Sequence, residues 1–308
     1  MQNLVSDINT ADTWIRYMRH GMFEEAWKFS DQVLKAGINR DYLNLPRHYQ
    51  CIWDGTPLAG KKVLIRCYHG LGDTIQFIRY APLVKEISRQ VIVWAQPDLI
   101  DLLRTVNGID LLLPLHNASP SVSYDVDVEV MELPHVFRST ISNIPVNIPY
   151  FHVKPVELSP GKEKLKVGLV WQAGDWDPSR NVPFSELVSL FERKEIDFYI
   201  LQPRAAEAGW REGLGYNPGE HNLTDFARIL AGMDLLITVD SMAAHLGGAL
   251  NVPVWLLLKE NADWRWMEKR SDSPWYPSMR LFRQEKHGDW LGVSAMIAKE
   301  LSVLRRMA

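Results

Sequence analysis

Cysteine is scarce in this 308-residue chain, which contains only Cys51 and Cys67. The two do not form a Cys-x-x-Cys pair, so neither a structural zinc site nor a disulfide framework is indicated. Apolar runs are short as well. The run VPVWLLL (252–258) is among the longest, and it falls far below the roughly 20 residues of a membrane-spanning helix. The polar first residues do not resemble a secretory signal. These features predict a cytoplasmic protein without a transmembrane segment.

An excess of charge of one sign is also missing. Lys and Arg number 34 against 37 Asp and Glu, for a net charge of -3. A balance of this kind gives no basic surface to suggest nucleic acid as a partner. With 46% hydrophobic residues over 308 positions, the chain exceeds what one core usually holds, so we expect two domains.

Strand and helix patterns alternate along the chain. Residues 11–37 are predicted to form two short helices around Gly21, as in one tetratricopeptide-type hairpin. Strands and helices then alternate, break in the proline-rich stretch 144–164, and start again. This order is typical of α/β domains with parallel sheets. We predict an N-terminal helical segment (1–57), a doubly wound Rossmann-like domain (58–150), a linker (151–164) and a second such domain (165–308), with a cleft between the two α/β domains.

Ligands of such sheets bind at the carboxyl ends of strands and at helix N-termini. The first place of this kind is HGLGDTIQ (69–76), with His69 at its start. Gly70 and Gly72 are expected to supply a turn, Asp73 to be the helix N-cap, and Gln76 to complete a capping box. The pattern leaves two interpretations open, a capped helix alone or a ligand site. It is not GxGxxG, so a dinucleotide is disfavoured.

The second place is TVDSMAAHLGGAL (238–250), where a buried strand is followed by a helix of small residues. The partial positive charge of that helix start suits a diphosphate. Asp240 fits better as an acceptor for a sugar hydroxyl, or it simply caps the helix. His245 is either a site residue or a core histidine. In the loop WQAGDWDPSRN (171–181), Arg180 is either a phosphate clamp or a solvated arginine.

One motif is set aside. DVD (125–127) matches the Asp-x-Asp motif of metal-dependent glycosyltransferases. It lies in an alternating strand pattern, where two aspartates on one face are usually solvated, and short motifs match by chance often. We therefore predict no metal site.

The chain resembles glycosyltransferase family 9, the ADP-heptose:lipopolysaccharide heptosyltransferases, and most of all the branch fused to tetratricopeptide repeats. The resemblance rests on HGLGDTIQFIRYAPL, MELPHVF, VGLVWQAG, TVDSMAAHLGGALNVPVW and DWRWMEKRSDSPWYPSMRLFRQ, which cover about 58–293 in order. It implies a GT-B fold, with the acceptor on the first domain and the nucleotide-sugar, ADP-linked in the heptosyltransferases, on the second. It implies no cofactor besides this donor.

The resemblance also implies roles for residues. Asp73 matches the general base, and Asp240 the aspartate that contacts the donor sugar. The other matches are the helix start under the diphosphate (Ser241, Met242 and Ala243), a basic residue for the phosphates (Arg180) and a residue lining the nucleotide site (Gln202). Three features depart from the family. The loop around Arg180 has no lysine, the repeats have shrunk to one hairpin, and the cysteine-rich metal finger of some members is absent.

The predicted reaction is therefore inverting, metal-independent transfer of a heptose or hexose to a hydroxyl of a glycan or protein, such as a bacterial cell-surface glycan. In the Trp-rich loop 261–277, Arg265 either meets phosphate or acceptor, or packs the loop. The alternative function is a non-catalytic GT-B-like scaffold that binds a protein partner through its N-terminal hairpin. Peripheral membrane association is compatible with both. A nucleotide-sugar epimerase is disfavoured, because no GxGxxG or YxxxK follows the first strand.

Overall fold

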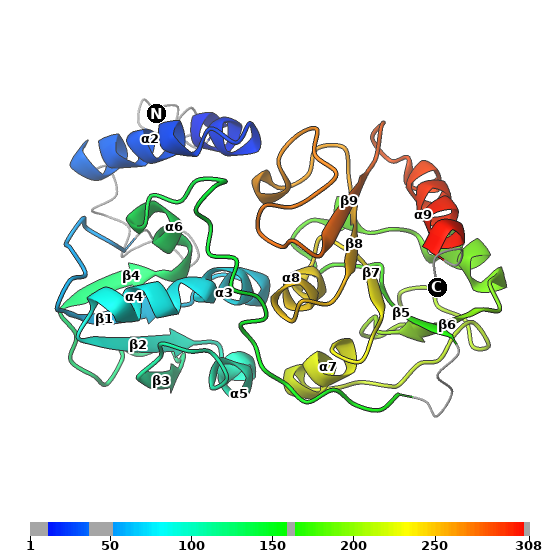
Figure 1. Cartoon of the computed structure of the whole chain (residues 1–308), viewed down its shortest axis with the longest axis horizontal. Coiled ribbons are helices and arrows are strands. Elements are labelled where there is room, and N and C mark those ends of the chain that lie inside the picture. Colours follow the sequence, from blue (N-terminus) through cyan, green and yellow to red (C-terminus); the bar gives the residue numbers. More distant parts are fainter. Residues whose placement is uncertain (1–11, 37–51, 159–163, 305–308) are drawn as a thin grey trace. The chain divides into compact units, whose positions relative to one another are not determined.

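The computed structural model describes residues 12–36, 52–158 and 164–304 (Figure 1). The chain divides into two compact units. Unit 1 comprises the chain up to Phe151 together with Asp263–Arg270, and unit 2 comprises His152–Ala262 and the chain from Ser271 onward. Nothing in the sequence pattern had pointed to the short segment 263–270 as part of the first unit. Cys51 lies outside the described residues, and Cys67 is buried.

Unit 1 is built on a four-stranded parallel sheet with the order β3-β2-β1-β4. The predicted strands are confirmed, and their bounds are β1 Lys62–Arg66, β2 Gln90–Ala95, β3 Leu111–Pro114 and β4 Val126–Glu129. The inner residues of β1 and β2 are buried along their length. This matches their continuous Val and Ile runs, since strands of parallel sheets are covered on both faces.

Short helices follow these strands. The bounds are α3 Leu71–Phe77 and α4 Ala81–Ile87 after β1, α5 Ile100–Leu103 after β2, and α6 Leu133–Val136 after β4. The helix that the sequence pattern had placed at Asp73 begins two residues earlier, at Leu71, and a 3₁₀ turn at Ile78–Tyr80 separates α3 from α4.

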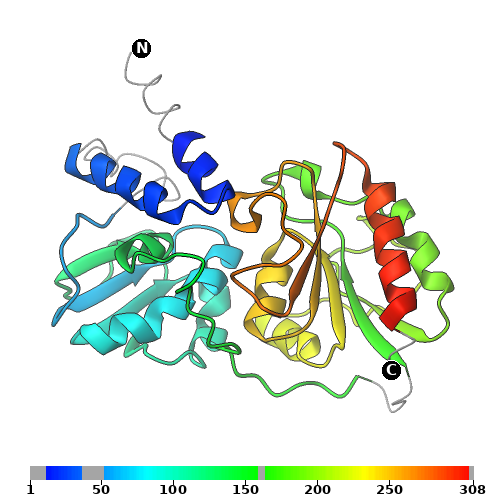
Figure 2. The ribbon, with the colours of Figure 1, turned by 45° about the horizontal axis from the view of Figure 1, so that its top comes forward.

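Two helices precede the sheet, at residues 12–19 and at α2 Phe23–Ala36, as predicted. Gly21 in the turn has φ +72, a value that favours glycine. The Nε1 atom of buried Trp27 on α2 donates to the carbonyl of Ser139 at 2.5 Å, and its ring stacks on His135 at 5.6 Å. This hairpin therefore packs on the part of unit 1 that contains α6 (Figure 2).

Unit 2 is built on a five-stranded parallel sheet with the order β6-β5-β7-β8-β9. Its strands are β5 Leu165–Val170, β6 Ile196–Ile200, β7 Leu235–Val239, β8 Val254–Leu258 and β9 Met279–Arg283. Its helices are α7 Leu223–Leu230, α8 Met242–Ala249 and α9 Trp290–Leu304, with a long 3₁₀ segment at Phe184–Glu192.

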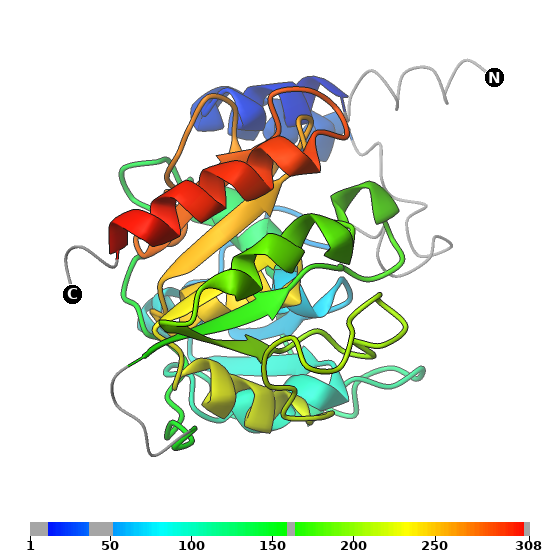
Figure 3. The same ribbon diagram turned by 90° about the vertical axis from the view of Figure 1, so that its right-hand side faces the viewer.

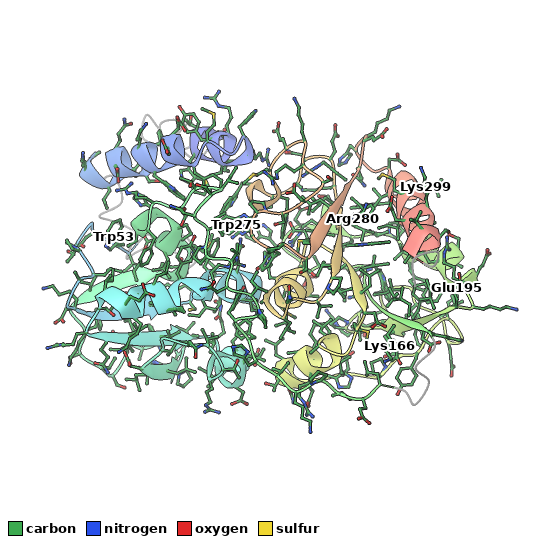
Figure 4. The ribbon with its side chains drawn as sticks, in the orientation of Figure 1. Trp53, Lys166, Glu195, Trp275, Arg280 and Lys299 are labelled. Carbon is green, nitrogen blue, oxygen red and sulfur yellow. The ribbon has the colours of Figure 1, made fainter. Side chains whose placement is uncertain are left out.

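The larger core of unit 2 lies between the sheet and the pair formed by α9 and the 3₁₀ segment, which lie side by side (Figure 3). The Oγ of Ser294 joins the two by donating to the carbonyl of Glu186 at 2.5 Å. On this core, Trp171 and Phe184 pack ring to ring at 4.8 Å. Figure 4 shows how the side chains of Glu195 and Lys299 project at the periphery of this unit, while Trp275 is fully buried.

Both sheets contain a topological switch point, where the strand order reverses. In unit 1 the chain runs from β1 outward through β2 to β3, then returns to the other side of β1 as β4. In unit 2 it runs from β5 to β6, then returns to the other side of β5 as β7. Ligands of doubly wound proteins bind beyond the strand ends at such points. The fold thus singles out the turns after β1 and β4 in one unit, and those after β5 and β7 in the other.

Candidate active site

Asp73 lies at the switch point of unit 1, in the first turn of α3. The predicted cap is wrong in detail. The N-cap is Gly70, and Asp73 occupies the third helical position because the helix begins at Leu71. The Oδ2 atom of Asp73 accepts a hydrogen bond from the Gly70 amide at 2.9 Å. This is the role of the acidic residue in a capping box, which Gln76 had been expected to fill.

The two glycines of this turn do not serve as the sequence had suggested. Gly70 has φ -68, and Gly72 lies inside α3 with no left-handed backbone. Space is the tighter constraint at Gly70. A Cβ placed there would lie 3.2 Å from the Oδ2 of Asp73. The absence of a side chain therefore lets the carboxylate of Asp73 approach the Gly70 amide closely.

Arg265 contacts Asp73 directly. It lies in the 3₁₀ turn Trp264–Trp266 of the segment 263–270, and it is 7% exposed. Its Nη2 donates to the Oδ1 of Asp73 at 2.5 Å, and its Nε donates to the Oε1 of fully buried Gln76 at 2.8 Å. The sequence had left two roles open for this arginine, contact with phosphate or acceptor and packing of the loop. In the structure it contacts the candidate base.

Two glutamates lie at the end of β4, at the same switch point. Glu129 is the last residue of the strand, and Glu132 belongs to the motif MELPHVF, in which sequence reasoning had not singled it out. Glu129 is 1% exposed, and its Oε2 lies 3.8 Å from the Nε2 of His69. Burial, with repulsion from Glu132 and Asp73, raises the pKa of Glu129 well above its ordinary value. A carboxyl group at the carboxyl end of a buried strand was the signal that could have identified Glu129.

Glu132 links the backbone at Ile52 and Trp53 to the end of β4. Its carboxyl group accepts hydrogen bonds from the amides of Ile52 at 3.1 Å, Trp53 at 3.0 Å and Glu129 at 2.8 Å. Burial is the largest influence on this group. It outweighs the three amides, which favour the charged form, and raises the pKa of Glu132 to about 7.

The aspartates of the DVD motif are engaged with basic and backbone partners. Asp127 forms a two-pronged ion pair with Arg66. Asp125 accepts a hydrogen bond from the Lys62 amide at 2.8 Å, and lies 3.6 Å from the Nη2 of Arg89. Both carboxylates therefore have structural roles at the β1 and β4 strands.

In unit 2, Asp240 and Arg180 meet at the switch point between β5 and β7. Asp240 directly follows β7 and is 8% exposed. The Nη1 of Arg180 donates to the backbone carbonyl of Asp240 at 3.0 Å, and its Nε donates to that of Asp177 at 3.3 Å. Two residues that sequence reasoning had placed in the donor site are thus in contact.

The helix start predicted after Asp240 is present. Ser241 is the N-cap of α8, with extended backbone and no side-chain cap. Met242 and Ala243 are the first two helical residues, and Ala243 is buried. The first amides of a helix have no partner within the helix. In α8 they lie at the carboxyl edge of the sheet, where a diphosphate would gain from them.

Two further predicted residues support the frame of this site. The Oε1 of Gln202 accepts hydrogen bonds from the amides of Trp171 at 3.0 Å and Gln172 at 2.8 Å, which fixes the start of the loop after β5. His245 is 5% exposed within α8, and its Nδ1 lies 3.0 Å from the Oη of Tyr276. His245 therefore has the buried, hydrogen-bonded surroundings of a core histidine.

Lys259 is a basic residue that sequence reasoning missed. It directly follows β8, forms an ion pair with Asp177, and donates to the Oγ of Ser179 at 2.9 Å. Burial opposes the charge of Asp177, but the hydrogen bonds from Lys259 and Ser179 prevail and lower its pKa to about 2. A lysine that follows β8 therefore contacts the loop 171–181, which contains no lysine of its own. The position of Lys259 at the same sheet edge was the available signal.

Comparison of the whole fold with solved structures finds glycosyltransferases. A family 9 glycosyltransferase from Veillonella parvula superposes with a TM-score of 0.58 at 13% identity, covering 81% of this chain and 99% of that one. The ADP-heptose lipopolysaccharide heptosyltransferase II of E. coli gives 0.54 at 14% identity, over 80% and 100%. E. coli heptosyltransferase WaaC, bound to a fluorinated ADP-heptose, gives 0.51 at 12% identity, over 78% and 99%.

Sequence comparison gives a weaker signal. No family model matches the chain. Protein FlbA of Caulobacter vibrioides is 23% identical over 297 residues, covering 81% of this chain and 48% of that protein. This chain therefore spans about half the length of that relative. Taken together, the comparisons show that the chain has the two-sheet α/β fold of GT-B glycosyltransferases. No helix among the described residues is both long and apolar enough to cross a membrane.

Proposed function

We propose that this protein is an inverting glycosyltransferase, which moves a sugar from a nucleotide-sugar to a hydroxyl of a glycan or protein without a metal. The proposal rests on where the candidate base and the candidate donor-binding residues lie in their two sheets. Asp73 in unit 1, and Asp240 with the α8 start in unit 2, each lie at the switch point of a parallel sheet. The fold is that of glycosyltransferases, although the identity to the solved structures is only 12–14%.

Unit 2 would hold the donor. The amides at the start of α8 and the guanidinium of Arg180 offer positive charge for a diphosphate, and Lys259 adds an ammonium at the end of β8. As the sugar leaves, the diphosphate gains negative charge, which these groups stabilise in place of a metal. Asp240 would accept a hydrogen bond from a sugar hydroxyl.

Unit 1 would hold the base. Asp73 would accept the proton of the acceptor hydroxyl as that oxygen attacks the anomeric carbon from the face opposite the diphosphate, which inverts the anomeric configuration. A carboxylate has about four lone-pair positions. Two of those on Asp73 accept hydrogen bonds from Gly70 and Arg265, so capacity remains for a substrate hydroxyl. General bases of this kind contribute about 10²–10⁴-fold to rate.

The donor class follows from the fold neighbours. Two of the solved structures are named for ADP-heptose or an ADP-heptose analogue, so ADP-linked heptoses are the first donors to test, followed by nucleotide-linked hexoses. A thermal-shift panel of nucleotide-sugars tests the proposal. A ligand at 100 times its Kd adds about 2.7 kcal/mol to stability, so a true donor should raise the melting temperature clearly. A panel of ADP-, UDP-, GDP- and dTDP-sugars with no effect would argue against a donor site.

One observation favours the alternative of a non-catalytic scaffold. Both oxygens of Asp73 already accept hydrogen bonds from within unit 1, one of them from a buried arginine. Such a carboxylate can serve only to tie the start of α3 to Arg265, with no part in a reaction. Slow hydrolysis of the donor by water separates the two functions, because a glycosyltransferase releases nucleoside diphosphate from its donor and a scaffold does not.

A further inference from the structure

Arg265 is enclosed by unit 1 on several sides. Its backbone amide and its Nη1 both donate to the Oδ1 of Asp263, at 3.0 Å and 2.9 Å. Its guanidinium lies over the ring of Trp264 at 4.6 Å and over that of Phe77 at 5.4 Å. These contacts come in addition to the bonds with Asp73 and Gln76 described above. Buried ionic groups are costly unless they are fully paired, and this one is paired by two carboxylates and an amide oxygen.

We infer that Arg265 is a positioning residue for Asp73, and that the N-terminal hairpin braces the turn that carries it. The inference rests on the proposed function, in which Asp73 is the general base. It assigns to Arg265 a part in catalysis that acts through Asp73 and requires no contact with substrate.

The geometry of the Asp73 carboxylate supports this role. The Gly70 amide fixes Oδ2 and the Nη2 of Arg265 fixes Oδ1, so the plane of the carboxylate is set from both ends. A general base must be held close to its productive geometry, because small displacements of reacting groups cost rate steeply. The Gly70 bond alone leaves the carboxylate free to rotate about it. Arg265, whose planar fork is itself held by Asp263 and Gln76, removes that freedom.

The hairpin contacts the arginine-bearing segment on both sides of Arg265. The ring of Trp14 packs edge-on against Trp264 at 5.1 Å, and Trp264 in turn stacks on Phe77 of α3 at 6.3 Å. After Arg265, the amide of Glu268 donates to the carbonyl of Arg19 at 3.0 Å. The hairpin therefore holds the 3₁₀ turn against the helix that contains Asp73. The sequence had suggested that this hairpin binds a protein partner. In the structure the ring of Trp14 packs against Trp264 within unit 1.

A purely structural role for Arg265 makes a different prediction. If the arginine only balances buried charge, its removal lowers the stability of the protein but leaves the orientation and reactivity of Asp73 unchanged in the molecules that remain folded. If it positions Asp73, its removal changes that orientation and reactivity even where the protein is fully folded. The test must therefore read the Asp73 carboxylate itself, by rate and by a measurement that needs no activity.

The kinetic arm uses the full chain and the nucleotide-sugar that the wild type turns over. Arg265→Ala should lower kcat by about 10- to 100-fold and leave the donor KM within about twofold, and Arg265→Lys should recover part of the loss. In a background of Asp73→Asn, Arg265→Ala should cause no further loss, because residues that act through one another are not additive.

Trp14→Ala should also lower kcat. Met22→Ala, which changes an exposed residue of the same hairpin, should leave kcat unchanged. A kcat of Arg265→Ala within twofold of wild type, or losses that multiply in the double variant, would overturn the inference.

The second arm measures amide hydrogen exchange at Gly70, whose amide bonds to Asp73. Arg265→Ala should speed exchange there by about tenfold or more, at a temperature where amides of β1 and β2 keep their wild-type protection. Met22→Ala is the control. Unchanged exchange at Gly70 would overturn the inference. If the wild type turns over no donor, the proposed function fails, and the exchange measurement still decides whether Arg265 positions Asp73.

Discussion

The guanidinium of Arg180 donates to the backbone carbonyl of Asp240 at 3.0 Å, and so joins the loop after β5 to the end of β7 across the switch point of unit 2. An arginine that holds a backbone carbonyl at this edge is preorganised for an anion. Its side chain loses less freedom when the anion binds than a solvated arginine would.

The first prediction concerns this contact. Arg180→Ala should weaken binding of the free nucleoside diphosphate by about tenfold, which corresponds to about 1.4 kcal/mol, with little change in melting temperature. Isothermal titration with ADP and UDP provides the measurement. Arg211→Ala, an exposed arginine of the same unit, serves as the matched control. Equal affinities in all three proteins would remove Arg180 from the donor site.

The second prediction concerns metal. Transfer or donor hydrolysis should persist in excess EDTA, because helix amides and basic side chains are proposed to carry the diphosphate. Asp125 and Asp127 are already engaged by the Lys62 amide and by Arg66. The rate with and without chelator is the measurement. Loss of activity in EDTA that is restored by magnesium or manganese would contradict metal-independent transfer.

The third prediction concerns pH. The pKa of Glu132 is about 7 in the folded protein and about 4.3 in an unfolded chain. A raised carboxyl pKa means that the folded state binds the proton more tightly. The stabilisation of the folded state by the protonated Glu132 is therefore fully present below about pH 4 and is lost as pH rises through 7. Glu129 acts in the same direction.

Stability against urea should accordingly fall between pH 5 and pH 8, by up to about 3 kcal/mol from Glu132, since one pKa unit corresponds to about 1.36 kcal/mol. Glu132→Gln should make the curve flatter over this range, although it is less stable at pH 5 because the amide cannot accept all three backbone hydrogen bonds. A wild-type urea midpoint that rises over the same range would contradict the assignment.

The fourth prediction concerns the packing of α8. A Cβ at Gly248 would lie 2.4 Å from the Cδ1 of buried Tyr276. Gly248→Ala should therefore destabilise unit 2 by about 1–3 kcal/mol, the usual range for overpacking, despite the higher helix propensity of alanine. A Cβ at Gly174 would meet nothing within 4 Å, so Gly174→Ala is the control. Chemical denaturation of both variants is the measurement, and equal midpoints would show that α8 is not held as closely as described.

Much of the fold could be predicted from local patterns. All nine of the described strands had been predicted from such patterns. Most were recognised by apolar runs, which suit parallel strands buried on both faces, and β4 by its period-two alternation. Helix starts were harder to place. Asp73 suggested an N-cap, but the cap is Gly70 and the aspartate reaches back from the third helical position. A sequence pattern cannot tell which of several residues in a turn supplies the oxygen and which the amide.

Only those residues of the candidate site that follow the end of a buried strand could be predicted from the sequence. Asp73, Asp240 and the start of α8 all follow buried strands, which the sequence pattern shows. The partners of Asp73 and Asp177 could not be predicted, because Arg265 lies 192 residues from Asp73, and Lys259 lies 82 from Asp177. Contacts at such separations depend on how the chain returns to an earlier unit or on strand order. Neither is encoded in local periodicity.

The most direct test of the central claim is the release of nucleoside diphosphate from nucleotide-sugars by the full chain, with wild type and Asp73→Asn compared on the same donors. The wild type should release nucleoside diphosphate from at least one donor, ADP-heptose being the first to try. The variant should remain folded, and its release should fall by at least about 100-fold, the lower end for loss of a general base. Wild-type protein that releases none from any donor, or an Asp73→Asn protein as fast as wild type, would contradict the account.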